Sequence, residues 1–300
     1  MGKISIVINT LNEEKNLPQA ISSVRRIADE IVVVDMYSDD GTAAVARKMG
    51  AKVFEHKRTG YVEPARNFAI EKATGDWILI LDADEEIPES LAAKLKNIAD
   101  SDNALDYYAI PRKNYCFGKW MRYSRSWPDY NIRFFKKGNV AWGDEIHSVP
   151  VTQGKGGDLE ATSENAITHY NYTSVEQFVD RLNRYTTHQV SVIGKTGYKF
   201  YWPDLLHKPL SEFVSRYFYG MGYKDGVHGL ALSLLQAFSE LVLYLKIWQT
   251  EKFEKKELSL KRVSHELKKS QKEMNYWLAT AFLKEKDSLL QRIKRKYRLL

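Results

Sequence analysis

Two aspartates separated by one residue stand directly after an apolar run. Asp82 and Asp84 follow Trp77–Leu81, and Glu85 and Glu86 come next. Neighbouring carboxylates repel each other unless a proton or a cation lies between them. A Mg²⁺ or Mn²⁺ ion bound by one or two carboxylates and by substrate phosphates is a common solution. The DxD motif therefore predicts a divalent metal site for a phosphate-bearing substrate, although Asp-x-Asp taken alone is also typical of a solvated loop.

Polar residues also follow two earlier apolar runs. Asp35 ends the second run, 30–34. In open α/β sheets, ligands bind beyond the carboxyl ends of the strands. We therefore expect these strand ends and the DxD motif to lie together at one ligand site. The residues that follow the first run, 3–9, are Thr10, Leu11, Asn12 and Glu13.

The apolar runs also predict the elements that would position these groups. Short apolar strands that alternate with helices indicate an α/β fold with a parallel sheet and helices on both faces. Neither the GxGxxG fingerprint nor the GxxxxGK phosphate-binding loop is present. Strands are expected at 3–9, 30–34, 52–55 and 77–81, helices near 14–27, 41–49, 63–73 and 88–98, β-like runs at 106–111 and 131–136, and helices from about residue 174.

Three strings in the N-terminal part carry a more specific signal. Their order, spacing and residue types closely resemble those of family 2 glycosyltransferases. Within that family the chain is most similar to lipopolysaccharide-core and related cell-surface sugar transferases, over roughly residues 3–250. The three strings are Ile8–Glu14, Glu30–Asp35 with Ser38–Thr42, and Gly75–Glu85. The segments similar to the lipopolysaccharide biosynthesis enzymes are Pro111–Trp120, Trp127–Tyr130, Arg133–Phe135, His169–Tyr172 and Gly222–Gly226.

This resemblance implies a GT-A fold, in which a Rossmann-like sheet carries helices on both faces, followed here by a C-terminal helical extension. It also implies an inverting transfer of a hexose from a nucleoside-diphosphate sugar, usually a UDP-sugar, with Mg²⁺ or Mn²⁺ as cofactor. The acceptor would be a cell-surface glycan, a glycolipid or a peptide. A bound metal would stabilise the charge that the diphosphate leaving group gathers.

The resemblance also implies roles for individual residues by matching position. Asp84 would be the principal metal ligand, with Asp82 near the ribose or the metal and Ala83 between them at the nucleotide sugar. Arg66 would lie near the nucleotide. His169 would serve the metal or the diphosphate, although a histidine in a β-rich segment is more often a structural, hydrogen-bonded group. The base and the ribose would be held by Thr10, Leu11, Asn12, Glu13 and Asp35.

The base that deprotonates the acceptor hydroxyl must be a carboxylate within hydrogen-bond reach of it. Related sequences often place a glutamate directly after a histidine, but here Ser148 follows His147. Glu145 is the favoured alternative, and Asp144 and Asp129 remain open. The residues expected on the acceptor side are Trp127, Asp129, Arg133 and His147.

The net charge of +7 is concentrated at the C-terminus. Residues 251–300 hold 15 Lys and Arg against 7 Asp and Glu, whereas the other 250 residues hold 30 against 31. A basic tail indicates an anionic partner, and the near-neutral remainder argues against nucleic acid. A solvated charged helix face is the alternative. Amphipathic stripes in 229–248 and beyond residue 260 favour peripheral contact with a membrane or helix pairing in a homo-oligomer.

Composition divides the chain into three expected parts: a GT-A catalytic domain at 1–210, an amphipathic helical segment at 211–250 and a basic helical tail at 251–300. The single cysteine fits a reducing compartment, and neither a signal peptide nor a membrane-spanning helix is expected. The predicted location is the cytoplasm, with contact to the inner face of the cytoplasmic membrane left open.

Two rival functions also remain. The first is a nucleotidyltransferase of similar fold, although residues 10–13 lack the glycine-rich, basic loop that such an enzyme needs. The second is a membrane-binding protein that acts through its basic tail.

Overall fold

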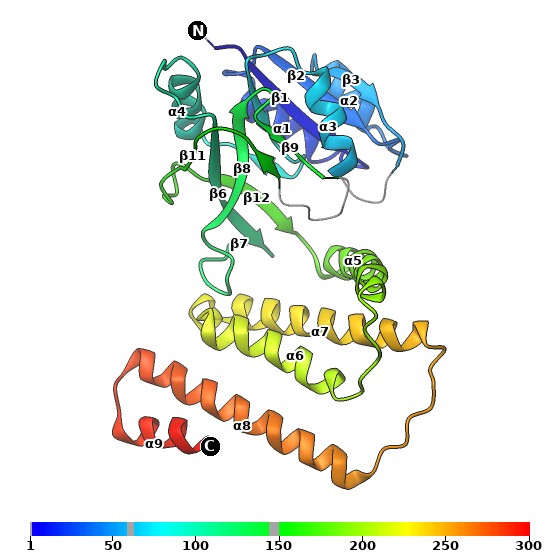
Figure 1. Ribbon diagram of the computed structural model, residues 1–300. Helices are drawn as coiled ribbons and strands as arrows, with labels where there is room; N and C mark the ends of the chain where they lie inside the picture. Colours follow the sequence, from blue (N-terminus) through cyan, green and yellow to red (C-terminus); the bar gives the residue numbers. More distant parts are fainter. Residues whose placement is uncertain (1, 59–62, 144–149) are drawn as a thin grey trace. The chain divides into compact units, whose positions relative to one another are not determined.

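The computed structural model describes residues 2–58, 63–143 and 150–300 (Figure 1). Residues 1–114 and 128–171 form one compact unit, which holds most of the β-sheet and which we call the sheet unit. Residues 115–127 and 172–300 form a second, mostly α-helical unit, which we call the helical unit. These compact units differ from the three parts expected from composition, and that functional division stays a prediction.

The first part of the sheet is parallel, with strand order β3-β2-β1-β4. Its strands are continuous apolar runs because helices cover both faces of the sheet. β1 is buried along almost its whole length, and β4 is fully buried. The predicted strands are confirmed, with ends within one residue of those expected. They are β1 (Ile4–Thr10), β2 (Glu30–Asp35), β3 (Lys52–Glu55) and β4 (Trp77–Ile80).

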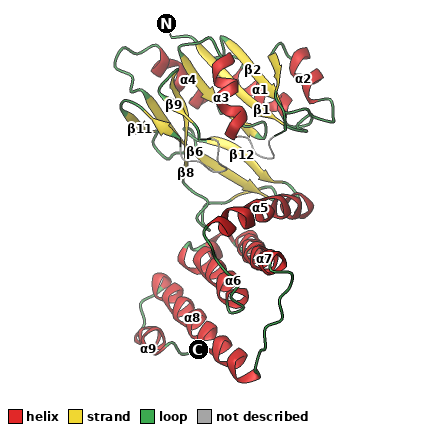
Figure 2. Cartoon of the chain, turned by 45° about the vertical axis from the view of Figure 1, so that its right-hand side comes forward, coloured by secondary structure: helices red, strands yellow, loops and turns green. Residues whose placement is uncertain are grey.

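Alternate residues of these strands enter two separate cores. Ile6 and Ile8 of β1 pack on one side with residues of α1 and α4, whereas Val7 packs on the other side with residues of α3. A strand points successive side chains to opposite faces, so a sheet covered on both faces needs apolar residues at every position. Helices on both faces are thereby confirmed (Figure 2). The helices of this unit are α1 (Leu17–Val24), α2 (Thr42–Lys48), α3 (Glu63–Lys72) and α4 (Glu89–Ala99).

The rest of the sheet is mostly antiparallel, with the parallel pair of β6 and β11 as the exception, so the prediction of a parallel sheet holds mainly for the first four strands. β8 (Asp129–Lys136) pairs antiparallel with β4, and β6 (Tyr107–Cys116) pairs antiparallel with β8. Neighbouring antiparallel strands need no crossover helix, and the structure has no helix between α4 and α5 in the residues that it describes. The remaining strands are β5 (Glu85–Glu86), β7 (Lys119–Trp120), β9 (Val140–Ala141), β10 (Val151–Thr152), β11 (Gly156–Asp158) and β12 (Ile167–Tyr172).

The helical unit is organised around two long helices. α7 packs against α5 and α6, whereas α8 packs against α6 and α9. A π-helical turn and a 3₁₀ turn join α6 to α7. The elements are α5 (Val175–Lys195), α6 (Asp204–Val214), η1 (Ser215–Tyr219), η2 (Gly222–Asp225), α7 (Val227–Thr250), α8 (Leu260–Glu285) and α9 (Leu289–Tyr297) (Figure 1).

By length and composition, α7 could cross a membrane, with a mean hydropathy of 1.5 over its most apolar window. It also packs within the helical unit, where Leu243 and Ile247 are buried. The Lys246 ammonium donates to Asn183 Oδ1 at 2.7 Å and to Thr186 Oγ1 at 2.9 Å, both on α5. These contacts favour a helix packed in protein, and the absence of a spanning helix stays a prediction.

Asp225, at the end of η2, holds a loop of the same unit. Its buried carboxylate accepts hydrogen bonds from the backbone N–H groups of Arg122 at 3.3 Å and Tyr123 at 2.8 Å. Burying a charge is costly unless such donors satisfy it. The same loop carries Trp120 and Trp127, whose rings pack edge to face with their centres 5.1 Å apart. Asp225 therefore orders an aromatic loop.

Candidate active site at the carboxyl ends of the parallel strands

The first two strands end side by side in polar residues. Thr10 and Asp35 are register partners in the parallel pair of β1 and β2, and both are buried. The Thr10 hydroxyl donates to Asp35 Oδ1 at 3.2 Å, and the Ser38 hydroxyl donates to the same oxygen at 2.6 Å. The carboxylate of Asp35 is therefore held in a fixed direction at the strand end, as the sequence pattern predicts.

The loop after β1 is tied to the loop after β2. Asn12 has a positive φ of 59°, a conformation that asparagine tolerates better than most residues. Its side-chain oxygen accepts from the Asp39 backbone N–H at 2.7 Å, and the Glu13 backbone N–H donates to Thr42 Oγ1 at 2.8 Å. Leu11 packs partly against the core of the sheet. The residues predicted to hold base and ribose are thus brought together, while that binding role stays a prediction.

Asp82 is paired with two arginines. Its Oδ1 lies 3.2 Å from Arg66 Nη2 and its Oδ2 lies 2.6 Å from Arg133 Nη2. Burial raises the pKa of Asp82, but the charges of Arg133 and Arg66 outweigh it and hold that pKa well below its usual range. Both oxygens are therefore engaged with guanidinium groups. This arrangement disfavours Asp82 as a direct metal ligand.

Glu85 lies beneath the DxD loop and is 1% exposed. Its Oε1 accepts from Arg112 Nη1 at 3.1 Å and from Arg133 Nη2 at 3.0 Å, and its Oε2 accepts from the Asp82 backbone N–H at 2.8 Å. Arg133 is thus buried in ion pairs with two carboxylates. Burial lowers the pKa of Arg133, but the charges of Asp82 and Glu85 outweigh it and raise that pKa. Its predicted contact with the acceptor stays a prediction.

Asp84 faces His169. Asp84 Oδ2 and His169 Nε2 lie 3.6 Å apart, and the backbone N–H of Tyr170 donates to the Asp84 carbonyl at 2.9 Å. β5 begins directly after Asp84, and β12 carries His169. The two strands pair antiparallel, with His169 opposite Glu85. A separation of 3.6 Å is too long for a direct hydrogen bond. Both atoms belong to groups that bind metal ions, and they face each other.

Asp129 is fully engaged by donors within the sheet unit. Its Oδ2 accepts from Arg112 Nη2 at 2.7 Å and from Asn114 Nδ2 at 3.0 Å, and its Oδ1 accepts from Asn131 Nδ2 at 3.2 Å. Burial raises the pKa of Asp129, but the charge of Arg112 and the hydrogen bonds outweigh it, so that the pKa is lowered. A carboxylate stabilised in this way is a poor proton acceptor. The geometry therefore argues against Asp129 as the base.

The same hydrogen bonds determine which nitrogen of His169 carries a proton. An ionised carboxylate can only accept, so the amide NH₂ of Asn114 must face Asp129. The amide oxygen of Asn114 then faces His169 Nδ1 at 2.6 Å, and Nδ1 must donate to it. The neutral imidazole consequently carries its lone pair on Nε2, the atom that faces Asp84. Metal-binding histidines are held in this way by a partner on the other ring nitrogen.

The donor set fits a divalent cation that a substrate completes. Among residues 2–58, 63–143 and 150–300, no group of three His, Cys, Asp or Glu side chains could hold a metal by itself. Asp84 and His169 offer one oxygen and one nitrogen, and substrate phosphates commonly supply further ligands to Mg²⁺. Metal dependence itself stays a prediction.

Three predicted residues, Asp144, Glu145 and His147, lie outside the described residues. Trp127 lies in the helical unit, in the aromatic loop held by Asp225. Two residues that shape the site, Arg112 and Asn114, were not predicted as functional. Their spacing of two on β6 places both side chains on one face of the strand, which is the signal that could have indicated them.

Comparison with known proteins identifies the class. The family model for glycosyl transferase family 2 matches residues 5–156. An uncharacterized glycosyltransferase of Rickettsia typhi is 32% identical over 98% of this chain and 98% of its own length. A lipopolysaccharide core biosynthesis glycosyltransferase, LpsC of Rhizobium meliloti, is 24% identical over 82% of this chain and 92% of its length. The chain therefore belongs to glycosyl transferase family 2, and its sheet and helices form a GT-A fold.

Solved structures with similarity to the chain include two glycosyltransferases. S. aureus TarS 1-349, in complex with UDP, is 19% identical with a TM-score of 0.41, covering 62% of this chain and 65% of that one. Glucosyl-3-phosphoglycerate synthase from Mycobacterium tuberculosis, in complex with Mn²⁺ and UDP-glucose, is 22% identical with a TM-score of 0.31, covering 39% of this chain and 44% of that one. The chain thus spans less than two thirds of each of these proteins.

Proposed function

We propose that this glycosyltransferase transfers a hexose from a UDP-sugar to a cell-surface glycan, a glycolipid or a peptide, with inversion at the anomeric carbon. The observation that carries the proposal is the pairing of Asp84 with a His169 whose Nε2 lone pair is directed at it, 3.6 Å away. Asp84 follows β4, and His169 lies on β12. In the parallel sheet, β1 pairs with β4 and ends in Thr10, and β2 pairs with β1 and ends in Asp35. Nucleotide and diphosphate contacts are therefore expected at one edge of the sheet.

The nucleotide is proposed to bind along the first two strand ends. Asp35 would accept from ribose hydroxyls, because its carboxylate is held in a fixed position at the strand end by Thr10 and Ser38. The loop from Leu11 to Glu13 would contact the base. Arg66 already donates to Asp82, and its positive charge favours the diphosphate next to the DxD loop.

A divalent cation, Mg²⁺ or Mn²⁺, would supply Lewis-acid stabilisation to the departing diphosphate when bound. Asp84 and His169 would hold it, with Asn114 orienting the imidazole. Asp82, neutralised by Arg66 and Arg133, would keep the DxD loop in position.

The acceptor hydroxyl is proposed to lose its proton to Glu145, with Asp144 as the alternative. The acceptor oxygen bonds to the anomeric carbon as the bond between that carbon and the diphosphate oxygen breaks. The proton passes to the carboxylate and UDP leaves. Attack from the face opposite the leaving group inverts the anomeric centre. The engagement of Asp129 with Arg112 supports its exclusion from this role.

The remaining proposals concern the acceptor, the location and the pairing of subunits. Trp127 and His147 would contact the acceptor, together with Arg133. The enzyme is proposed to work in the cytoplasm at the inner face of the cytoplasmic membrane. Pairing of subunits through α7 is a second option, because Leu234 and Phe238 on that helix are about half exposed, at 52% and 47%.

Donor hydrolysis tests the proposed function. The full chain is incubated with a panel of nucleoside-diphosphate sugars and Mn²⁺ or Mg²⁺, and release of nucleoside diphosphate is measured with and without chelator. We expect metal-dependent UDP release from at least one UDP-sugar. Absence of nucleoside-diphosphate release, together with pyrophosphate release from a nucleoside triphosphate and a sugar phosphate, would identify a nucleotidyltransferase instead.

A further inference from the structure

The last helix, α9, displays its apolar side chains rather than burying them. None of its residues is buried. Leu289, Leu290, Ile293 and Tyr297 are 75%, 59%, 42% and 61% exposed, and Leu300, just beyond the helix, is 71% exposed. At 3.6 residues per turn the four helical positions, Leu289, Leu290, Ile293 and Tyr297, fall within about 100° of the helix circumference. They form one apolar arc, which we call the α9 arc.

Contacts with the rest of the unit leave the α9 arc uncovered. The Asn275 side chain on α8 donates to the Arg298 carbonyl at 3.1 Å, and the Arg298 guanidinium lies 5.6 Å from the centre of the Tyr276 ring. Arg292 forms an ion pair with Asp287 in the preceding turn. The polar and cationic contacts with α8 are thus made by Arg298, just beyond α9.

Basic residues surround the α9 arc. Residues 289–300 contain five Lys and Arg and no Asp or Glu. Lys294 and Lys296 fall on opposite borders of the arc by helical spacing. Long basic side chains in this position can extend their charge past an apolar surface into a polar layer. An apolar arc with basic borders is the pattern of a helix that lies in the interface of an anionic membrane.

The charge pattern selects among the partners that could cover the arc. Two copies of α9 packed arc to arc would bring their basic borders together, and like charges repel. An anionic lipid surface attracts the same residues and accepts the apolar side chains between its headgroups. We propose that α9 is a membrane-surface anchor that binds anionic phospholipid through the α9 arc and its basic borders. This inference deepens the membrane location given under the proposed function, and it does not depend on the proposed sugar transfer.

Vesicle co-sedimentation of the full chain tests the anchor. The protein is mixed with vesicles of phosphatidylcholine plus phosphatidylglycerol, or of phosphatidylcholine alone. We expect binding to the anionic vesicles only. Raising NaCl from about 0.1 M to about 0.5 M should weaken binding without abolishing it, because salt screens the charges but not the apolar contact.

Two variants separate the charge from the arc. Replacing Lys294, Arg295 and Lys296 by Gln should weaken binding at low salt by at least about tenfold. Leu290→Gln with Ile293→Gln should remove the binding that persists at high salt. Since no residue of α9 is buried, both variants should keep the circular dichroism and the thermal midpoint of the wild type.

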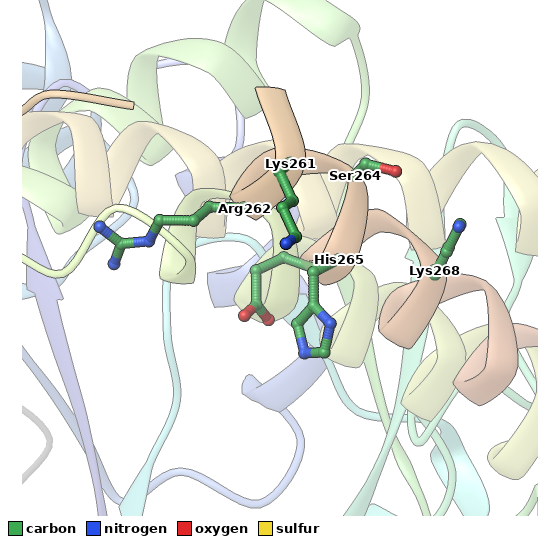
Figure 3. A pocket seen from close by; sticks show the side chains of 6 residues that line it. Lys261, Arg262, Ser264, His265 and Lys268 are labelled. Atoms are coloured by element: carbon green, nitrogen blue, oxygen red, sulfur yellow. The ribbon is translucent and has the colours of Figure 1, made fainter. Parts of the chain in front are cut away.

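A matched control removes the same charge from another helix. Lys261, Arg262 and Lys268 line a hollow on α8 with Ser264, His265 and Glu266, and their side chains extend from this one helix (Figure 3). All three are exposed, so a triple Gln variant also loses three charges. We expect its affinity for vesicles to lie within about threefold of the wild-type affinity, because electrostatic attraction by charges outside α9 is a small part of the binding.

Three results would overturn the proposal. The first is no binding of the full chain to anionic vesicles. The second is an equal loss of vesicle binding in the α8 control and in the α9 charge variant. That result would mean that the electrostatic attraction to the vesicles comes from the whole basic surface and not from α9. The third is that the protein does not bind vesicles and that substitutions in the α9 arc halve its molar mass in light scattering. That result would identify the α9 arc as a contact between subunits. Donor hydrolysis is measured in parallel and should be unchanged in every variant.

Discussion

The Asn114 side-chain oxygen accepts a hydrogen bond from His169 Nδ1 at 2.6 Å, and both residues are buried. Asp129 orients the amide from its other end at 3.0 Å. The imidazole is consequently held with Nε2 toward Asp84 before any substrate binds. Asn114 is a positioning residue for the cation proposed between Asp84 and His169.

Asn114→Ala should weaken Mn²⁺ binding in the presence of UDP by about 10–100-fold, the usual cost of losing a residue that orients a metal ligand. Binding is measured by calorimetry, and the Mn²⁺ dependence of donor hydrolysis is measured alongside. Asn131→Ala is the matched control, because Asn131 also donates to Asp129, at 3.2 Å, and has no hydrogen bond to His169. Equal effects of the two substitutions would show that the orientation of His169 is irrelevant.

Asp84→Ala should lower transfer by at least about a hundredfold, since it removes the carboxylate expected to hold the cation that stabilises the leaving group. The thermal midpoint should change little because Asp84 contributes no apolar packing. Excess chelator should reduce wild-type activity to the level of the variant. Wild-type rates in chelator, or full activity of Asp84→Ala, would rule out the metal site.

Glu145→Gln should lower turnover by about 10²–10⁴-fold, the range expected for loss of a general base. The affinity for UDP should remain unchanged, because the base acts on the acceptor. Turnover and UDP binding are measured on the same preparations, with Asp144→Asn in parallel. If neither variant slows transfer by about tenfold, the base lies elsewhere in the chain.

The lowered pKa of Glu30 predicts that part of the protein's stability is lost at acidic pH. Burial raises its pKa, but hydrogen bonds from Lys52, Ser5 and Thr74 outweigh it and lower that pKa to about 2 from an ordinary value of 4.5. Because the pKa is lower in the folded state, the contribution of Glu30 to stability is present above about pH 4.5 and is lost as the pH falls toward about 2.

Glu30→Gln should therefore destabilise the protein by about 2 kcal/mol at neutral pH, with a difference from wild type that shrinks below about pH 4.5. Urea unfolding across this range measures the difference. Glu55→Gln, which removes a charge from an exposed carboxylate on β3, serves as the control and should show no such trend. A difference that is constant with pH would contradict the role assigned to Glu30.

Asp225→Asn should release the aromatic loop that Asp225 holds, because an amide cannot accept from both the Arg122 and Tyr123 backbone N–H groups as the carboxylate does. Trypsin cleavage after Arg122 or Arg125 should become about tenfold faster, since local opening controls such cleavage. Asp180→Asn, an exposed change on α5, is the control. Cleavage at the wild-type rate would mean that other contacts order the loop.

The local pattern of apolar residues in the sequence was sufficient to predict the parallel part of the sheet. The runs that became β1, β2 and β4 are apolar on both faces at most positions because both faces of the sheet are covered, and that signal is visible in the sequence. The polar residues at their ends could also be placed at one edge, since parallel strands end together. The family resemblance, confirmed by the family model, extended this to the GT-A fold.

The tertiary structure decided what surrounds each carboxylate. Asp82, Asp84 and Asp129 look alike in the sequence, yet Asp82 pairs with two arginines, Asp129 accepts from Arg112 and Asn114, and Asp84 faces His169. These partners come from β6, β8, β12 and α3, and the antiparallel pairing that brings them together leaves no periodic signal near the DxD motif. Residue type and spacing indicate that charged groups meet at a strand end. Which charges neutralise one another depends on contacts between distant segments, and those arise only when the chain folds.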